Sequence, residues 1–108
     1  MAKTSVKAIP LEGFDSASLT ASYQAINPTG LPAACFMLRI SNRTKGDIEI
    51  SYDGVTNHEY ILSDETFELP VQLSAQPTAW EALISKGTIV YIKGTASVGT
   101  IRLTAYYV

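Results

Sequence analysis

Apolar and polar residues alternate with a period of two along several short stretches of the chain, and turn-forming residues separate those stretches. The clearest case is segment 47–52, in which Ile48, Ile50 and Tyr52 point to one face and the intervening polar residues to the other. Such alternation is typical of a β-strand with one buried face. The other segments predicted as strands are 4–9, 16–26, 34–41, 57–62, 66–73, 88–93 and 100–108.

The segments between these strands carry the residues that turns and loops favour. Asp53-Gly54 joins two alternating segments, and we expect a tight hairpin turn there, because Gly adopts positive φ without steric cost. Segment 11–15 is predicted as a connector, segment 27–32 as a loop with two prolines and a glycine, and Gly94–Gly99 as a turn.

Three predicted elements have a distinctive character. Segment 34–41 is the most continuously apolar strand, so we expect it to be central and covered on both faces. Segment 66–73 contains Pro70, which indicates an edge strand or a bend. Segment 78–86 is predicted as one short helical turn that ends before Gly87, since Thr78 and Glu81 match a capping box.

About eight short strands with regular turn signals indicate an all-β protein. The predicted fold is an antiparallel β-sandwich of jelly-roll type. A barrel of five or six strands is the alternative. With 108 residues and no internal repeat or linker, residues 1–108 are expected to form a single domain.

The charge content of the chain bears on its partners. Charged residues make up 17% of the chain, which is low for a globular protein, and the formal net charge is −2. A sparsely charged surface suits a protein covered by partners in an oligomer or particle, and equally a monomer with a polar, uncharged surface. No basic stripe is present, so we expect neither nucleic-acid nor anionic-membrane binding.

The cysteine content and the apolar segments indicate where the chain is made. The one cysteine, Cys35, lies in an apolar run and is predicted to be a buried small hydrophobe. No apolar stretch approaches the length of a membrane span, and the start of the chain lacks the apolar core of a signal peptide. We therefore expect a soluble chain made in a reducing cytoplasm.

Few residues suggest catalytic or metal chemistry. His58 is the only histidine, and a lone histidine on a hairpin arm more often caps a loop hydrogen bond or faces water than binds a metal. Five residues carry side-chain oxygens that could bind calcium, but their spacing matches no calcium-binding loop motif: Asp53, Asn57, Glu59, Asp64 and Glu65.

Motifs for catalysis and phosphate binding are absent from the sequence, which has no Gly-x-Ser-x-Gly elbow and no phosphate-binding loop. Asn42-Arg43-Thr44 matches a glycosylation acceptor, but without a secretion signal it is interpreted as a turn. We predict no catalytic residues, no metal, no cofactor and no enzymatic activity.

Aromatic residues leave one further binding function open. A carbohydrate-binding module would place two or three aromatic rings exposed on one face. Aromatic residues in strands serve core or interface packing more often than sugar binding. The tyrosines in or beside predicted strands are Tyr52, Tyr60, Tyr91, Tyr106 and Tyr107.

Two segments taken together resemble small virion structural proteins of tailed bacteriophages. The first runs from Leu38-Arg39-Ile40 through Asn42-Arg43-Thr44 into residues 48–58, with the sequence IEISYDGVTNH. The second is KGTIVYIKG at 86–94, followed by GTIRLTAYY at 99–107. In those phage proteins a strand ending in an Asn-x-Thr turn leads to an "iSyDGv" segment, and a "kGt-vyikg" segment and a "GtirltayY" strand close the chain. The resemblance covers about residues 34–108.

The resemblance implies a β-sandwich that assembles on a phage particle and has no catalytic residues. The function expected first is that of a capsid auxiliary, or decoration, protein that binds the assembled head. A neck or tail accessory protein is the alternative within the virion, and the carbohydrate-binding module is the alternative outside it. The expected partners are the major capsid protein or neck and tail components, together with further copies of the chain. The expected location is the virion, after synthesis in the host cytoplasm.

Overall fold

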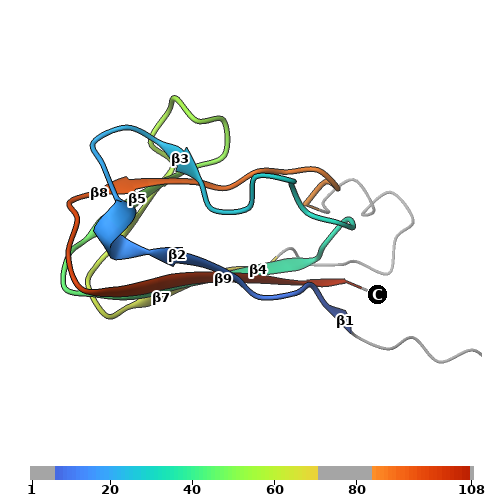
Figure 1. Cartoon of the computed structure of the whole chain (residues 1–108). Coiled ribbons are helices and arrows are strands. Elements are labelled where there is room, and N and C mark those ends of the chain that lie inside the picture. The colour runs from blue at the N-terminus through green and yellow to red at the C-terminus, as the bar shows by residue number, and fades with distance from the viewer. Residues whose placement is uncertain (1–6, 71–83, 108) are drawn as a thin grey trace, which may run out of the picture.

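Residues 7–70 and 84–107 are described by the computed structural model, and they are almost entirely β (Figure 1). They form nine strands and one 3₁₀ turn, so the all-β prediction is confirmed for these residues. In chain order the elements are β1 (Lys7–Ala8), β2 (Glu12–Asp15), η1 (Ser16–Ser18), β3 (Gln24–Ala25), β4 (Met37–Thr44), β5 (Ile48–Ser51), β6 (Glu59–Ile61), β7 (Thr66–Pro70), β8 (Tyr91–Gly94) and β9 (Gly99–Tyr107).

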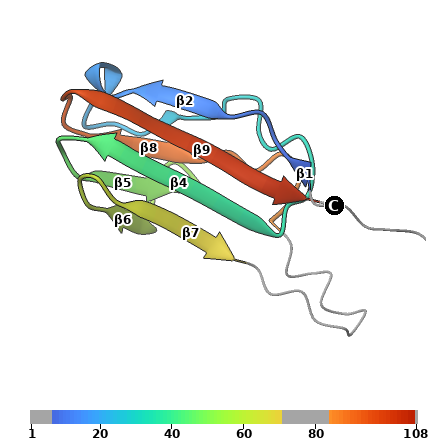
Figure 2. The ribbon, with the colours of Figure 1, turned by 90° about the horizontal axis from the view of Figure 1, so that it is seen from below.

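The strands form two antiparallel sheets that lie one over the other (Figure 1). The first sheet, called here the β4/β9 sheet, has the order β1-β9-β4-β7, and β2 also pairs with β9. The second, the β5/β8 sheet, has the order β3-β8-β5-β6. Figure 2 views the molecule from the side of the β4/β9 sheet, with β2, β9, β4 and β7 in front. The predicted sandwich is therefore confirmed.

The strand pairing has the pattern of a jelly roll. β2 pairs with β9, β3 with β8, β4 with β7 and β5 with β6, as in one long hairpin whose tip is the β5–β6 loop. Rolling that hairpin up adds the pairs β4–β9 and β5–β8 and distributes the strands between two sheets. These eight strands are the jelly-roll set, and β1 is an additional short strand at the end of β9.

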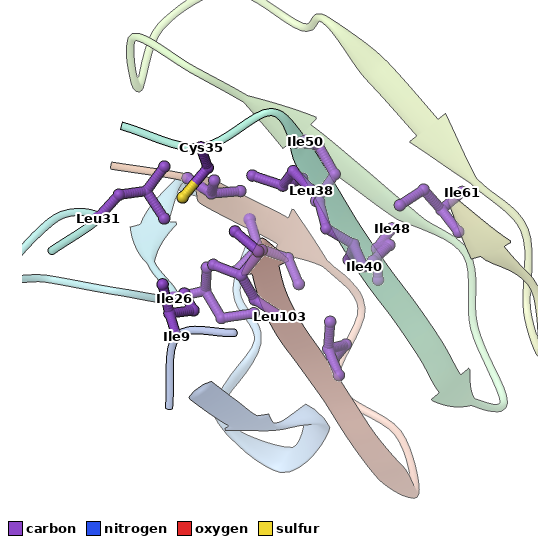
Figure 3. Packing of buried hydrophobic residues seen from close by; sticks show 14 of the residues in the cluster. Ile9, Ile26, Leu31, Cys35, Leu38, Ile40, Ile48, Ile50, Ile61 and Leu103 are labelled. Atoms are coloured by element: carbon purple, nitrogen blue, oxygen red, sulfur yellow. The ribbon is translucent and has the colours of Figure 1, made fainter. Parts of the chain in front are cut away.

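The core fills the space between the two sheets (Figure 3). On β5 and β9 the inward-facing positions are those that the alternation indicated: Ile48 and Ile50 on β5 are fully buried, as are Ile101 and Leu103 on β9. Full burial of one such aliphatic side chain stabilises the folded state by about 1.5–3 kcal/mol relative to exposure. The remaining buried hydrophobic residues are Ile9, Leu19, Ile26, Leu31, Cys35, Leu38, Ile40, Ile61, Val90, Ile92 and Ala105.

Strand β4 is central, as predicted, but it is covered on one face only. It lies between β9 and β7 in its sheet. Leu38 and Ile40 point into the core, whereas Arg39 and Arg43 on the opposite face are exposed. The prediction of burial on both faces was wrong because Arg39 interrupts the apolar run, and a charged side chain is almost never fully buried.

The N-terminal third departs most from the predicted elements. Segment 11–15, predicted as a connector, contains β2, which pairs with β9. Segment 16–26, predicted as one strand, contains η1 and only the short β3. Asp15 caps η1 by accepting the Ala17 N–H, and the Thr20 hydroxyl accepts the Ser22 N–H. These local side-chain hydrogen bonds compete with sheet pairing and explain why the alternating segment does not form one strand.

The remaining segment predictions have mixed outcomes. β7 is an edge strand that ends at Pro70, as that proline indicated, and β9 reaches Tyr107. Gly94–Gly99 spans the β8–β9 turn, as predicted. The predicted helical turn at 78–86 lies mostly in residues 71–83, outside the described residues. In residues 84–86, the part of this segment that the structure describes, Ile84 forms an antiparallel β-bridge with Cys35.

Candidate functional site

Residues 52–58 form the loop between β5 and β6, where the sequence places most of its candidate functional residues. The predicted tight Asp53-Gly54 turn is wrong in its length, because the connection includes all of residues 52–58. Gly54 nevertheless adopts the positive φ expected of it, +81°. Asp53 organises the loop, since its Oδ1 accepts the N–H groups of Thr56 and Val55, each at 2.8 Å.

These bonds also determine the electrostatics of the Asp53 carboxylate. Hydrogen bonds from the Thr56 and Val55 N–H groups and from the Ser51 hydroxyl hold the pKa of Asp53 well below its usual range. Each of these donors favours the charged form of the carboxylate. Asp53 is therefore an ionised group that holds the loop together rather than a proton donor.

His58 closes the base of the loop. Its Nδ1 accepts the Tyr52 N–H at 3.0 Å, and its own backbone N–H donates to the Ile50 carbonyl at 2.8 Å. The His58 and Tyr52 rings stack with a centroid distance of 5.3 Å. This is the loop hydrogen-bonding role that the sequence indicated for His58.

A shallow hollow of about 240 Å³ lies beside this loop on the outer side of the β5/β8 sheet, lined by Glu49, Asn57, His58, Glu59 and Tyr60. Glu49 lies 3.5 Å from the Lys93 ammonium, and the Tyr60 hydroxyl donates to Asp47 at 2.8 Å. Hydrogen bonds from the Ser63 N–H and from Tyr60 lower the pKa of Asp47. The hollow thus combines the Glu49 carboxylate with an amide, an imidazole and an aromatic ring. The Glu59 side chain lies on the other face of the sheet, because Glu59 is the register partner of the buried Ile50.

Three further residues of this surface were not among the sequence candidates. The Tyr23 hydroxyl donates to the Asn57 side chain, and the Lys93 ammonium lies 4.7 Å from the centre of the Tyr23 ring. Glu49 is the third, and its outward position on segment 47–52 was already visible in the alternation. Tyr23 and Lys93 could not be placed here without the β3–β8–β5 strand order.

The five residues whose oxygens were considered for calcium do not form one site. Asp64 pairs with Arg43, and the Glu65 carboxylate accepts the Leu62 N–H, so both serve the β6–β7 turn. Asp53, Asn57 and Glu59 belong to the β5–β6 loop and its border. Within residues 7–70 and 84–107, no group of three or more His, Cys, Asp or Glu side chains is arranged to hold a metal ion.

Asn42 is fully buried inside β4, so the interpretation of Asn42-Arg43-Thr44 as a turn was wrong. Its Nδ2 donates to the carbonyls of Gly46 and Leu62, each at 3.0 Å, and its Oδ1 accepts the Thr44 hydroxyl at 2.6 Å. A buried amide must be hydrogen-bonded to be tolerated. Asn42 therefore ties the β4–β5 turn to the end of β6 and is inaccessible to a modifying enzyme.

The tyrosines do not form a flat binding platform. Among the five strand-associated tyrosines only Tyr60 is exposed, at 60%, and the others are half-buried. Tyr52 packs against the core, and burial together with nearby Glu59 raises its pKa to about 12. Cys35 is fully buried, as predicted, and burial raises the pKa of its thiol.

Comparison with known proteins gives limited information. No protein-family model and no curated protein matches the chain. One solved chain of similar shape comes from Bacillus endospore appendages, described as a family of disulfide-linked pili. It shares 13% identity at a TM-score of 0.49, covering 98% of this chain and 90% of that one. A second, PirA, shares 16% identity at a TM-score of 0.41, covering 97% and 96%.

Helices of the described residues offer no candidate for a membrane span, since none is both long and apolar enough.

Proposed function

We propose that the chain is a non-enzymatic structural protein of a tailed-bacteriophage virion, and within the virion a capsid auxiliary protein bound to the assembled head. The observation that best supports this proposal is the position of the two phage-like segments in the fold. The first covers β4 and β5, and the second covers β8 and β9. β4 pairs with β9 and β5 with β8, so the resemblance follows the adjoining central strands of both sheets.

The use of the polar side chains supports a structural role. A hydrolase needs an oriented nucleophile and a base free to accept its proton. Here His58 Nδ1 is occupied by the Tyr52 N–H, and the Ser51 hydroxyl bonds to Asp53 within the same loop. The residues that could have served chemistry instead hold the β5–β6 loop in place.

The proposed mechanism is mass action. A protein that binds an assembled lattice but not its separate subunits stabilises the lattice by its binding free energy. The partners are the major capsid protein or, for the alternative location, neck or tail components. The chain is made in the host cytoplasm and functions on the virion, together with other copies of itself.

The alternatives differ in what the surface must present. A neck or tail accessory protein would use the same fold, and only its position on the particle distinguishes it. A carbohydrate-binding module would need several exposed rings on one face, and the half-buried state of four of the five strand tyrosines speaks against it. For this reason the virion role is preferred.

Adding the purified chain back to particles that lack it tests the proposal. We expect the chain to co-sediment with mature heads but not with unassembled capsid subunits, and to raise the temperature at which the heads release DNA. Binding to tails alone would move the assignment to the accessory alternative. No binding to any part of the particle would overturn it.

A further inference from the structure

A pocket of about 420 Å³ lies at the end of the sandwich where three turns meet. These are the β4–β5, β6–β7 and β8–β9 turns, which Figure 2 shows together at one end of the molecule. The volume falls within the roughly 300–1,000 Å³ of sites that hold small ligands. Loops positioned by a rigid scaffold are also where binding residues concentrate. The pocket shares no lining residue with the hollow beside the β5–β6 loop.

Hydrogen bonds between the turns hold the pocket in shape. The Lys45 N–H donates to the Val98 carbonyl at 3.2 Å, which joins the β4–β5 turn to the β8–β9 turn. The Ser63 hydroxyl donates to the Thr44 carbonyl at 2.5 Å, which joins the β6–β7 turn to the end of β4. Because its walls are tied to one another in this way, the pocket is formed before any ligand binds.

Two cations line the pocket, and one of them already has a carboxylate partner. Arg43 donates to the Oδ1 and the carbonyl of Asp64, at 3.0 and 3.1 Å. Lys45 is exposed, and its ammonium forms no ion pair with any described residue. Asp47 borders the pocket through Ser63, and both of its carboxylate oxygens already accept hydrogen bonds from described residues. Lys45 therefore supplies the charge that this pocket offers to a ligand.

The β8–β9 turn adds an apolar side chain to the same pocket. Val98 is 72% exposed and lines the pocket together with Lys45. Covering such a side chain contributes to affinity in proportion to the apolar area removed from water. A phosphate or sulfate ion has no apolar part that would cover Val98, whereas a peptide carries carboxylates and apolar side chains next to one another. The pocket therefore suits an acidic peptide better than a small inorganic anion.

We propose that this pocket binds an aspartate or glutamate side chain from an exposed segment of a partner protein. The Lys45 ammonium pairs with the carboxylate. Arg43, held in place by Asp64, supplies a second donor, since a guanidinium group has five N–H groups and matches a carboxylate well. Val98 contacts an apolar residue next to the acidic one. The inference does not depend on the proposed virion role, because the purified chain alone tests it.

An NMR titration of the full, isotopically labelled chain with blocked dipeptides tests the proposal. We expect acetyl-Leu-Asp-amide to shift the amide signals of Ser63 and Gly99 in a saturable manner that weakens as salt screens the charges. Acetyl-Leu-Asn-amide has nearly the same shape without the charge and should not bind. Inorganic phosphate, which lacks the apolar part, should bind more weakly than the aspartate peptide.

Substitutions separate the contributions of charge and apolar contact. Lys45→Glu should lower the association constant of the aspartate peptide about tenfold, because an exposed ion pair is modest in strength and the reversed charge adds repulsion. Lys45→Met should lower it less, and it repeats the test should Lys45→Glu fail to fold. Lys86→Glu, the same charge change at an exposed turn residue outside the pocket, should leave it unchanged. Val98→Ser should weaken binding of the aspartate peptide but not of acetate. Circular dichroism verifies that each variant is folded.

Any of three results would overturn the proposal. One is the absence of a saturable shift at the Ser63 and Gly99 amides up to the solubility limit of the aspartate peptide. Another is that the asparagine peptide binds as well as the aspartate peptide, or that phosphate binds more tightly than either. The last is a pair of folded variants, Lys45→Glu and Lys45→Met, that both bind the aspartate peptide as Lys86→Glu does.

Discussion

The Nδ1 atom of His58 accepts the backbone N–H of Tyr52 at 3.0 Å, which closes the β5–β6 loop at its base. The side chain of His58 thus replaces one rung of the β-ladder just where the strands separate. His58→Ala removes this bond and the ring stacking on Tyr52. We expect the free energy of unfolding to fall by about 1 kcal/mol, measured by urea denaturation.

Val55→Ala, at an exposed position of the same loop, is the matched control and should leave stability unchanged. His58→Ala should also bind particles as the wild type does. A variant that is folded and binds normally, yet blocks infection at a glycan-degrading step, would show that His58 belongs to a catalytic site.

Gly54 combines positive φ with a close neighbour. A Cβ added there would lie 3.4 Å from the Tyr91 ring, whereas one added at Gly87, also at positive φ, would meet nothing within 4 Å. Gly54→Val should lower stability by about 1–3 kcal/mol through backbone strain, with a further loss from displacing Tyr91. Gly87→Val carries the strain alone and should cost less. Equal melting temperatures for Gly54→Val and the wild type would contradict this account.

Asn42 is the buried polar residue whose loss should matter most. Asn42→Leu leaves the Leu62 carbonyl without its Asn42 donor, whereas the Gly46 carbonyl and the Thr44 hydroxyl lose Asn42 but keep their bond to each other. Each buried unsatisfied group costs about 1–3 kcal/mol, so we expect a loss on the order of 3 kcal/mol in chemical denaturation. Ser41→Ala, at the adjacent position on the outer face, should be nearly neutral. A loss for Asn42→Leu no larger than that for Ser41→Ala would show that the network contributes little.

Stability should decline in acid because of the β5–β6 loop. The pKa of Asp53 is lower in the folded chain than the ordinary value of 3.8, so its contribution is fully present above that value. As the pH falls below it, the unfolded chain takes up the proton first, and the contribution is lost progressively. Asp53→Asn should show a shallower loss of stability below about pH 4. The same acid slope in mutant and wild type would contradict the assignment.

The sequence predicted those features of the structure that depend on residues close together in the chain, and it missed features that depend on contacts between distant residues. Alternation located β5 and β9, and Pro70 located an edge, because strand pattern and proline chemistry are local properties. Segment 16–26 was mispredicted because local hydrogen bonds of Asp15 and Thr20 compete with the strand pairing that its alternation indicated. Burial of the Asn42 amide requires hydrogen-bond partners, and one of them is the Leu62 carbonyl. That carbonyl lies near Asn42 only in the folded chain.

The candidate site shows the same division. His58 was correctly assigned to loop hydrogen bonding, because a lone histidine next to a turn has few other roles. The hollow beside it was not foreseen, since it needs Glu49 from β5 and Glu59 and Tyr60 from β6 in register. Likewise, the shared face of Arg39, Arg43 and Arg102 follows from the β4–β9 pairing and not from their spacing.

The measurement that tests the central claim most directly is the number and position of copies of this chain on purified phage particles. Quantitative mass spectrometry gives the copies per particle, and electron microscopy with a labelled chain gives their location. The virion role predicts a fixed copy number at symmetry-related sites, on the head for a capsid auxiliary protein. Particles purified from a phage that expresses the chain, but containing no copy of it, would contradict the account.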